Sequence, residues 1–255
     1  MNKVDLNSDM GESFGRYKLG NDEEIMRHIS SANIACGFHA GDPHILKYTI
    51  KLAKESGTAV GAHPGLPDLL GFGRRAMDTT PEELYDYFVY QIGAVQAFCT
   101  VMGVPMQHVK GHGIVEMMST ERPELAEAIA SAVKDVNPDL LYMTIAGTTL
   151  YETCKKTGLR VAGEAYGDRA YNDDGTLVSR KLPGSVIADP EVVAARIIQL
   201  LDTGTVTTYK GGTIKIAAQS ICMHGDTPGA ANLIRIVREK LDERGISVVP
   251  VGTLV

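Results

Sequence analysis

The sequence predicts an α/β protein in which strand–helix units repeat around a parallel sheet. Short β-branched or apolar runs alternate with segments of helical periodicity along the whole chain. The length of 255 residues suits a single α/β barrel, and no linker or low-complexity segment divides it, so we expect one domain over residues 1–255. A count of seven or eight units favours a closed barrel over the alternative, an open doubly wound sheet.

Eight segments have the composition of buried strands. The clearest are Ala59–His63 and Leu141–Ala146, because parallel strands covered on both faces are nearly continuous apolar runs. The predicted strands are Lys3–Asp9, Asn33–Cys36, Ala59–His63, His108–His112, Leu141–Ala146, Arg160–Ala165, Ser220–His224 and, as the optional eighth, Ser247–Val251.

Helices between the strands carry start and stop signals. Asp42-Pro43 predicts an N-cap followed by proline at the first helical position, and Thr80–Glu83 is a capping box for a helix running towards Met102. Asp189-Pro190 and Thr227-Pro228 likewise predict an N-cap followed by proline at the first helical position. The helix after Asp42-Pro43 is expected to bury Ile45, Thr49, Leu52 and Ala53. The glycines expected as left-handed helix ends are Gly57, Gly103, Gly158 and Gly245.

Charge and cysteine content limit the function classes. The 31 acidic and 25 basic residues give a net charge of -6, which argues against general binding to nucleic acid or anionic membranes. No run of about 18 apolar residues predicts a membrane helix. The N-terminal residues do not resemble a signal peptide, and the four cysteines form no CxxC pair, so we expect a cytoplasmic protein. The turn-rich stretch 167–188 predicts a long loop over one end of the barrel.

Glycines and ionisable residues gather where the predicted strands end. Five such clusters are Asp5–Glu12, Cys36–Asp42, Gly61–Gly65, Lys110–Gly113 and His224–Asp226. The carboxyl ends of strands form the active-site face of an α/β barrel, and glycine there lets the backbone approach a ligand. The five clusters therefore predict one site at this face.

Individual residues divide into candidates for chemistry and for structure. Lys110 lies two residues before a histidine and shares its side of the strand. His28 and His108 lie beside apolar residues, and we expect structural roles for both. The histidines between small residues at strand ends, expected to be functional, are His39, His63, His112 and His224.

Several of these clusters have two interpretations. Asp42 and Asp226 are suited to capping helices as well as to binding. Cys36 is a possible nucleophile with His39 as its base, but a buried cysteine more often packs. The segment Gly71–Arg75 is either an anion site or a surface turn.

A metal site is a further alternative that the sequence leaves open. No HxxxH or HExxH pair lies on a helix. A divalent cation could instead be gathered from separate strands, because imidazole nitrogen and carboxylate oxygen suit zinc or a similar ion. The residues considered for such a site are Asp5, Asp9, His63 and His112.

Several motifs, in collinear order over essentially the whole chain, resemble the LamB/YcsF family. The longest and most specific is Ser31–Asp42 (SANIACGFHAGD). The others are Asp5–Glu12, Val60–Gly65, Gly71–Arg75, Asp168–Tyr171, Asp174–Val178 and Cys222–Gly229. The resemblance implies an irregular seven-stranded β/α (TIM-like) barrel of the glycoside hydrolase and deacetylase type.

The resemblance also implies an activity. Family members act as the A subunit of an ATP-dependent 5-oxoprolinase, which cleaves the lactam 5-oxo-L-proline to L-glutamate with ATP as co-substrate and with subunits B and C as partners. On this basis Lys110 or Arg74 holds negative charge, and Asp9 or Glu12 is the base. His63 and His112 move protons or stabilise the developing oxyanion. The expected catalytic residues are Asp9, Glu12, His39, His63, Lys110 and His112. The expected substrate-binding residues are Asp5, Asn7, Arg74, His224 and Asp226.

One motif departs from the family pattern. The usual Lys-Pro-His-Gly-Ala-Leu-Tyr-Asn is replaced here by Lys110–Met117 (KGHGIVEM). The lysine and histidine remain, whereas Gly111 replaces the proline and Glu116 the tyrosine. Such a change could alter the substrate pocket, so a related lactam or cyclic amide is an alternative substrate. Two other functions stay open: an ATP-independent, metal-dependent amide hydrolase or deacetylase, and a non-catalytic subunit of a lactam hydrolase.

Overall fold

Seven parallel strands form a closed barrel in the structure, a computed structural model that describes residues 2–225 and 229–255. The seven are β1 (Lys3–Met10), β2 (Ser31–Ala35), β3 (Ala59–His63), β4 (Met106–Val109), β5 (Leu141–Ile145), β6 (Arg160–Tyr166) and β9 (Ser220–Cys222). They pair in this order, and β9 pairs with both β6 and β1, which closes the sheet. The predicted barrel is confirmed, and the open doubly wound sheet is excluded.

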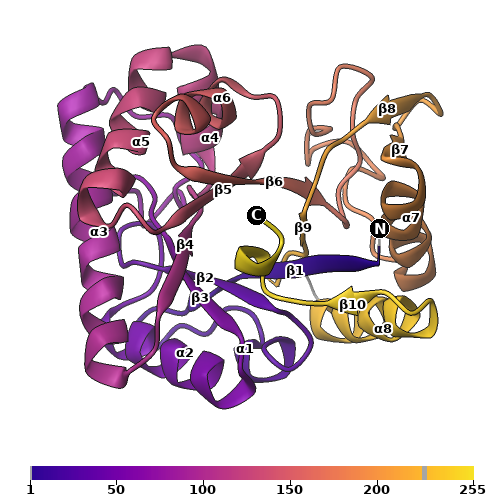
Figure 1. Ribbon diagram of the computed structural model, residues 1–255, viewed down its shortest axis with the longest axis horizontal. Coiled ribbons are helices and arrows are strands. Elements are labelled where there is room, and N and C mark those ends of the chain that lie inside the picture. Colours follow the sequence, from indigo (N-terminus) through magenta and orange to yellow (C-terminus); the bar gives the residue numbers. More distant parts are fainter. Residues whose placement is uncertain (1, 226–228) are drawn as a thin grey trace.

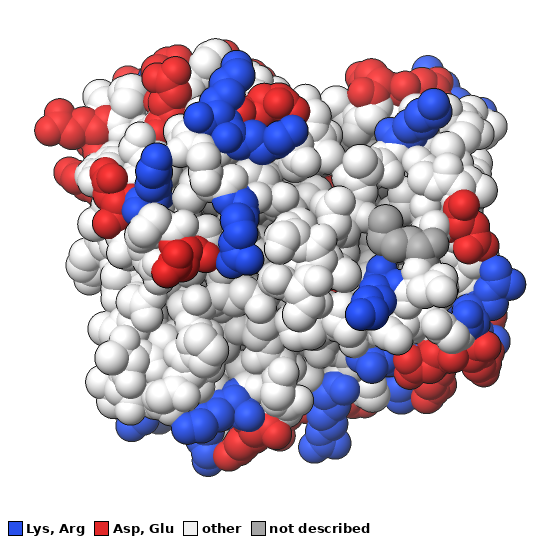
Figure 2. All heavy atoms as spheres, viewed as in Figure 1, with Lys and Arg blue, Asp and Glu red and all other residues white. Residues whose placement is uncertain are grey.

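Helices surround the strands on the outside of the barrel (Figure 1). They are α1 (Asp22–Ile25), α2 (Pro43–Ser56), α3 (Pro81–Met102), α4 (Ile114–Glu121), α5 (Pro123–Val136), α6 (Thr149–Lys156), α7 (Pro190–Thr203) and α8 (Ala230–Glu243). No helix within the described ranges 2–225 and 229–255 is long and apolar enough to cross a membrane. On the face drawn in Figure 2, acidic and basic side chains are interspersed and no basic stripe is visible.

The predicted helix starts and stops are found at the expected residues. Asp42 accepts from the N–H groups of His44 and Ile45, and Asp189 caps α7 in the same way. Thr80 and Glu83 form the reciprocal capping box of α3. The four predicted stop glycines all have positive φ. The start at Thr227-Pro228 lies outside the described residues.

The buried stripe of α2 differs from the prediction by one position. Its buried residues are Leu46, Thr49, Ile50 and Ala53. Ile45 and Leu52 are only partly buried. The apolar face of α2 is therefore rotated relative to the predicted one.

The predicted eighth strand is not a barrel strand. It is the short β10 (Ser247–Val248), which pairs with the first residues of β1, and a 3-10 helix, η1 (Val251–Thr253), follows. The Val251 side chain is buried with Leu141, Met143 and Ala162, so η1 closes the amino-terminal end of the barrel. Figure 1 shows this segment at the centre of the view.

Two further features lie outside the barrel. Strands β7 (Thr205–Thr207) and β8 (Thr213–Lys215) form an antiparallel hairpin that the sequence did not predict. The stretch 167–188, predicted as a loop, contains neither helix nor strand and is held by isolated bridges such as Arg169 to Val186. It starts where β6 ends, at the carboxyl end of the barrel.

Successive side chains of a barrel strand point alternately to the surrounding helices and to the barrel interior. On β1, Leu6 and Met10 point outward into the apolar core shared with the helices, and both are fully buried. Asp5, Asn7 and Asp9 have the opposite parity and face the barrel interior, where they meet polar groups from other strands. The barrel interior is therefore apolar at its amino-terminal end, where Val251 packs, and polar from Asp5 towards the carboxyl ends of the strands.

Candidate functional site

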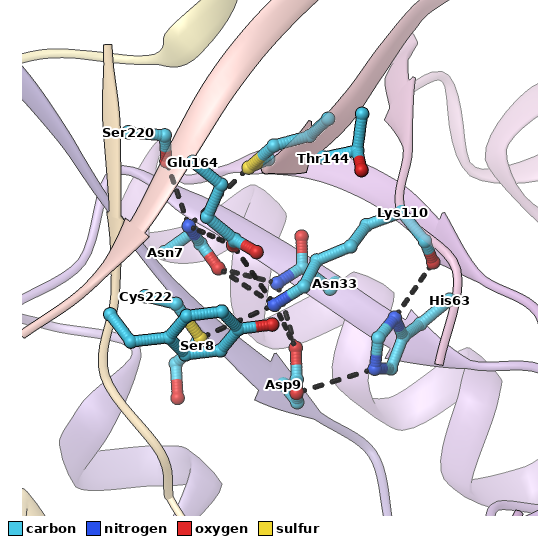
Figure 3. Close-up of polar contacts among 12 residues, drawn as sticks. Asn7, Ser8, Asp9, Asn33, His63, Lys110, Thr144, Glu164, Ser220 and Cys222 are labelled. Atoms are coloured by element: carbon cyan, nitrogen blue, oxygen red, sulfur yellow. Dashed lines mark hydrogen bonds and ion pairs between the residues drawn. The ribbon is translucent and has the colours of Figure 1, made fainter. Parts of the chain in front are cut away.

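A buried lysine occupies the centre of the barrel interior (Figure 3). Lys110 follows β4, and its side chain is 3% exposed. Its Nζ atom lies 3.0 Å from Asp9 Oδ1 and 3.0 Å from Glu164 Oε1. Burial alone would lower the Lys110 pKa, but the neighbouring negative charges, Asp9 first, hold that pKa well above its usual value. Lys110 is therefore a permanent cation between two carboxylates.

Asp9 joins this lysine to the histidines. Its Oδ1 accepts from Lys110 and, at 2.9 Å, from the amide of Asn33. Its Oδ2 lies 3.3 Å from Nε2 of His63. Burial would raise the Asp9 pKa, but His63 and Lys110 outweigh burial and hold that pKa well below its usual value. Asp9 is accordingly ionised at neutral pH.

Three histidines from three strand ends form a compact cluster. His63 ends β3, while His39 and His112 lie in the loops after β2 and β4. His63 Nε2 is 3.0 Å from His112 Nδ1. The His39 ring stacks on His112, with centroids 3.7 Å apart and an interplanar angle of 1°. Burial lowers the pKa of His112 to about 3 and that of His39 well below its usual value, so both rings are neutral.

Glycines make room for these rings. A Cβ on Gly65 would lie 2.7 Å from His39 Nδ1, and one on Gly73 would lie 2.8 Å from His112 Cδ2. Real Cβ atoms do not approach other atoms so closely, so any side chain at either position would displace a ring. The glycines that the sequence places beside ionisable residues thus enclose the histidine cluster.

Deeper in the barrel, Asp5 and Asn7 belong to a hydrogen-bonded support layer. Asp5 accepts from the hydroxyls of Ser30, Ser31 and Ser220 and is fully buried. Burial raises its pKa to about 6 despite these bonds. Asn7 donates to Glu164 at 2.9 Å and to Ser220 at 2.7 Å. Both residues lie before Asp9 on β1, further from the carboxyl end of the barrel.

The remaining predicted residues lie around the cluster. A carboxylate oxygen of the half-buried Glu12 is within 4.8 Å of ligand atoms of Asp9 and His112. Arg74 is exposed, and its guanidinium lies 4.9 Å above the Phe72 ring. His224 Nδ1 lies 2.9 Å from Asp168. Asp226 lies outside the described residues.

The sequence prediction missed several residues of the site. Glu164 pairs with Lys110, and Tyr166 lies between Lys110 and His224. Asn33 links Asp9 to His108 Nε2, which gives His108 the structural role expected for it. A signal for Glu164 existed, because a lone acid within the otherwise apolar strand β6 (RVAGEAY) needs a partner when buried.

Cys36 has no features of a nucleophile. Its thiol donates to the carbonyl of Ile34 at 3.2 Å, and burial raises the pKa of Cys36 to about 12. A neutral, buried thiol is inert. The packing interpretation of Cys36 is the one that the structure favours.

Comparison with known proteins supplies the family. The model of the LamB/YcsF family matches residues 4–255. The chain belongs to the LamB/YcsF family. Among its relatives, the 5-oxoprolinase A subunit of Thermococcus onnurineus is 49% identical over 253 residues, covering 99% of both chains. The protein of the same name from Pyrococcus furiosus is 48% identical, again over 99% of both chains.

Solved structures agree with this assignment. A lactam utilization protein from Thermus thermophilus superposes with a TM-score of 0.92 and 46% identity, covering 97% of this chain and 99% of that one. A putative cellobiose-phosphate cleavage protein from Enterococcus faecalis, at 16% identity and a TM-score of 0.61, shares the fold. The LamB/YcsF relatives therefore place this chain with proteins named as components of a 5-oxoprolinase.

The motif that departs from the LamB/YcsF pattern has a local structural explanation. A Cβ on Gly111 would lie 2.8 Å from the Tyr142 hydroxyl, so glycine leaves room for that ring. Glu116 on α4 is partly buried, and its carboxylate accepts from Thr144 at 2.6 Å. Thr144 has the opposite parity to the inward-facing Met143, so Glu116 packs behind β5 rather than in the barrel interior.

Proposed function

We propose that this chain is the A subunit of an ATP-dependent 5-oxoprolinase and cleaves 5-oxo-L-proline to L-glutamate together with subunits B and C. Support comes from relatives about half identical over nearly the whole chain, which carry the name of that 5-oxoprolinase component. The observation that carries the proposal is the meeting of Asp9, Lys110 and the histidines at the carboxyl end of the barrel.

The need for ATP follows from the chemistry of the lactam C–N bond. A five-membered lactam is a stable amide with a poor leaving nitrogen. Transfer of the γ-phosphoryl group of ATP to the lactam oxygen releases ADP and leaves an activated imidate. Water then adds to the carbon, and the C–N bond breaks as the nitrogen takes a proton. A second water releases phosphate from the resulting acyl phosphate and leaves glutamate.

The geometry suggests how residues divide these tasks. Glu12 is the better base for water, because Lys110 and Asn33 already occupy Asp9 Oδ1 and the Asp9 pKa is depressed. Lys110 is committed to Asp9 and Glu164, so we assign it to positioning them. Arg74, exposed near His112, is suited to hold the substrate carboxylate.

The histidines and the support layer complete the proposal. His63 and His112 are placed to pass a proton to the lactam nitrogen. They could also stabilise the developing oxyanion. Asp5 and Asn7 would act through their neighbours, since both are buried beneath Asp9. His224, paired with Asp168, would complete the substrate site on the side of Tyr166.

The test is glutamate release from 5-oxoproline by this protein, with and without B, C and ATP. Asp9→Asn, Glu12→Gln and His112→Ala are expected to lower turnover by about 100-fold or more, with circular dichroism unchanged. Asp135→Asn, which neutralises an exposed carboxylate on α5, is the matched control and should keep full turnover.

Each competing function has its own outcome. Lactam or amide hydrolysis by the lone protein without ATP would indicate an independent amide hydrolase. Full ATP-dependent turnover in folded Asp9→Asn and His112→Ala variants would indicate a non-catalytic subunit. Preference for another cyclic amide over 5-oxoproline would overturn the assigned substrate alone.

A further inference from the structure

A buried carboxylate holds both the ring and the backbone of His224. Asp168 lies in the loop after β6 and is 4% exposed. Both of its oxygens lie 2.9 Å from His224 Nδ1, and Oδ2 also accepts from the His224 backbone N–H at 3.2 Å. Burial would raise the Asp168 pKa, but the contacts with His224 outweigh burial and hold that pKa below its usual value. Asp168 is therefore an ionised acceptor at neutral pH.

This contact decides which ring nitrogen of His224 carries the hydrogen. An ionised carboxylate only accepts hydrogen bonds, so the hydrogen lies on Nδ1. In the neutral ring Nε2 then has the lone pair and is the atom that accepts a proton. Because Asp168 occupies Nδ1, any contact of this ring with a substrate is made by Nε2. A carboxylate that fixes a histidine in this tautomer is the arrangement that orients a general base in other hydrolases.

His224 lies at the edge of the site formed by Lys110 and Asp9. Its ring stacks on Tyr166, with centroids 5.5 Å apart and an interplanar angle of 17°, and Lys110 Nζ is 5.7 Å from the centroid of the same tyrosine ring. Gly225 lies beside the end of β1, since a Cβ there would be 3.5 Å from the Asp9 carbonyl oxygen. The His224 side chain is 11% exposed, so a small molecule at the carboxyl end of the barrel can reach it.

The first step of the proposed reaction needs a base that the residues assigned so far do not supply. The lactam nitrogen carries a hydrogen, and the neutral imidate forms only if this hydrogen leaves as a proton. The electrons of the N–H bond form the C=N bond, and those of the C=O π bond form the bond to the γ-phosphorus as its bond to ADP breaks. Asp9 Oδ1 is already bound by Lys110 and Asn33, and Glu12 is assigned to water in a later step.

We propose that His224, positioned by Asp168, is the base that takes the lactam proton during phosphorylation. Nε2 accepts the hydrogen bond of the lactam N–H and then the proton, and the ionised Asp168 stabilises the resulting imidazolium. The inference rests on the proposed function and extends it, because it restricts the substrates to cyclic amides with a free N–H. His63 and His112 act later, when the C–N bond breaks and the nitrogen takes a proton.

Histidine NMR of the purified protein, without lactam or ATP, tests the positioning by Asp168. Long-range ¹H–¹⁵N correlations report the tautomer of each imidazole, and His224→Gln identifies the His224 signal. At pH 9 wild type is expected to show the Nδ1–H tautomer of His224. In Asp168→Asn the amide N–H can donate to Nδ1, so the signal should shift towards the Nε2–H tautomer. Asp86→Asn, at an exposed carboxylate of α3, should match wild type.

ADP release and glutamate formation in a single turnover, with B and C present, test the role as base. His224→Gln and Asp168→Asn are expected to lower both rates by about 100-fold or more, with circular dichroism unchanged. His44→Gln, at an exposed histidine of α2, is the matched control and should keep both rates. The N-methylated lactam 1-methyl-5-oxoproline should release no ADP with wild type.

The outcomes separate this inference from the proposed function. ADP release at the wild-type rate in folded His224→Gln overturns the inference alone, whether or not glutamate follows. An Nε2–H tautomer of His224 in wild type overturns the positioning by Asp168. A wild-type complex that releases no ADP in response to 5-oxoproline overturns the proposed function and the role of His224 with it. If Asp168→Asn unfolds, the wild-type tautomer and the rates of His224→Gln still decide the question.

Discussion

The Nζ atom of Lys110 donates to Oδ1 of Asp9 across 3.0 Å inside the barrel. Glu164 lies at the same distance from Nζ, so one buried cation serves two carboxylates contributed by β1 and β6. Removing one partner of a buried ion pair leaves an uncompensated charge, which costs far more than the loss of a surface pair. The stability of the barrel should depend on this lysine.

Lys110→Met is expected to lower the free energy of unfolding by about 3–5 kcal/mol, because two carboxylates then share a buried site without a cation. Urea unfolding at pH 7 measures the change. Adding Glu164→Gln should recover part of the loss. Lys51→Met, which breaks an exposed pair with Glu55, should change stability by less than about 1 kcal/mol. Equal effects of the two lysine variants would contradict the assignment.

Glu116 should make stability depend on pH. Burial raises the pKa of Glu116 to about 8, whereas the pKa of a glutamate in the unfolded chain is about 4.5. Between these values the folded state holds a proton that the unfolded state has released, so the unfolding free energy falls as the pH rises from about 5 to 8.

Glu116→Gln removes this titration while retaining an acceptor for Thr144. The variant should gain about 3–5 kcal/mol relative to wild type between pH 5 and pH 9, at about 1.4 kcal/mol per pH unit. Denaturant unfolding of both proteins over this range gives the difference, in which other titrating groups cancel. A pH-independent difference would show that the Glu116 carboxyl is ionised throughout.

Gly111 and Tyr142 should be energetically coupled. Gly111→Ala places a methyl group 2.8 Å from the Tyr142 hydroxyl, and we expect a loss of about 1–3 kcal/mol from overpacking. Tyr142→Phe removes that oxygen, so the double variant should be more stable than Gly111→Ala alone. A double-mutant cycle by chemical unfolding measures the coupling. Purely additive losses would place the strain elsewhere.

The thiols should be unreactive in the folded protein. Burial raises the pKa of Cys36 to about 12, of Cys99 to about 11 and of Cys154 to about 12, and that of Cys222 well above its usual value. A disulfide reagent at pH 8 should label none of the four until denaturant is added. Cys36→Ala should also retain glutamate formation within about twofold. Rapid labelling of Cys36, or a 100-fold loss of turnover, would restore it as a nucleophile.

Local signals predicted the elements that depend on local physics. Ala59–His63 is a strand at the predicted residues, because a run of small and apolar residues suits a strand covered on both faces. Helix α3 (Pro81–Met102) is fixed by a capping box at one end and a glycine at the other. These features require no knowledge of distant residues.

Features that depend on partners distant in the sequence were harder to predict. Ser247–Val251 has the composition of a strand, but only Ser247 and Val248 find a partner, and Val251 instead fills the end of the barrel. Glu164 was missed because its partner Lys110 follows a different strand, β4, far from Glu164 in the sequence. The contacts of His63 Nδ1 and His112 Nε2 with the backbone carbonyls of Lys110 and Phe72 were also not predictable, because they are a property of the folded loops.

The position of β1 has a consequence for how the chain folds. Its neighbours include β9 and β10, so Lys3 pairs with Ser247 and Asp5 with Ser220. During synthesis on a ribosome, β1 can pair only with β2 until more than 200 further residues have emerged. Ring closure is then a late event with a large loop entropy, and the nascent strand carries an exposed edge throughout. Translation speed and chaperone binding should therefore affect the yield of this barrel more than its final stability does.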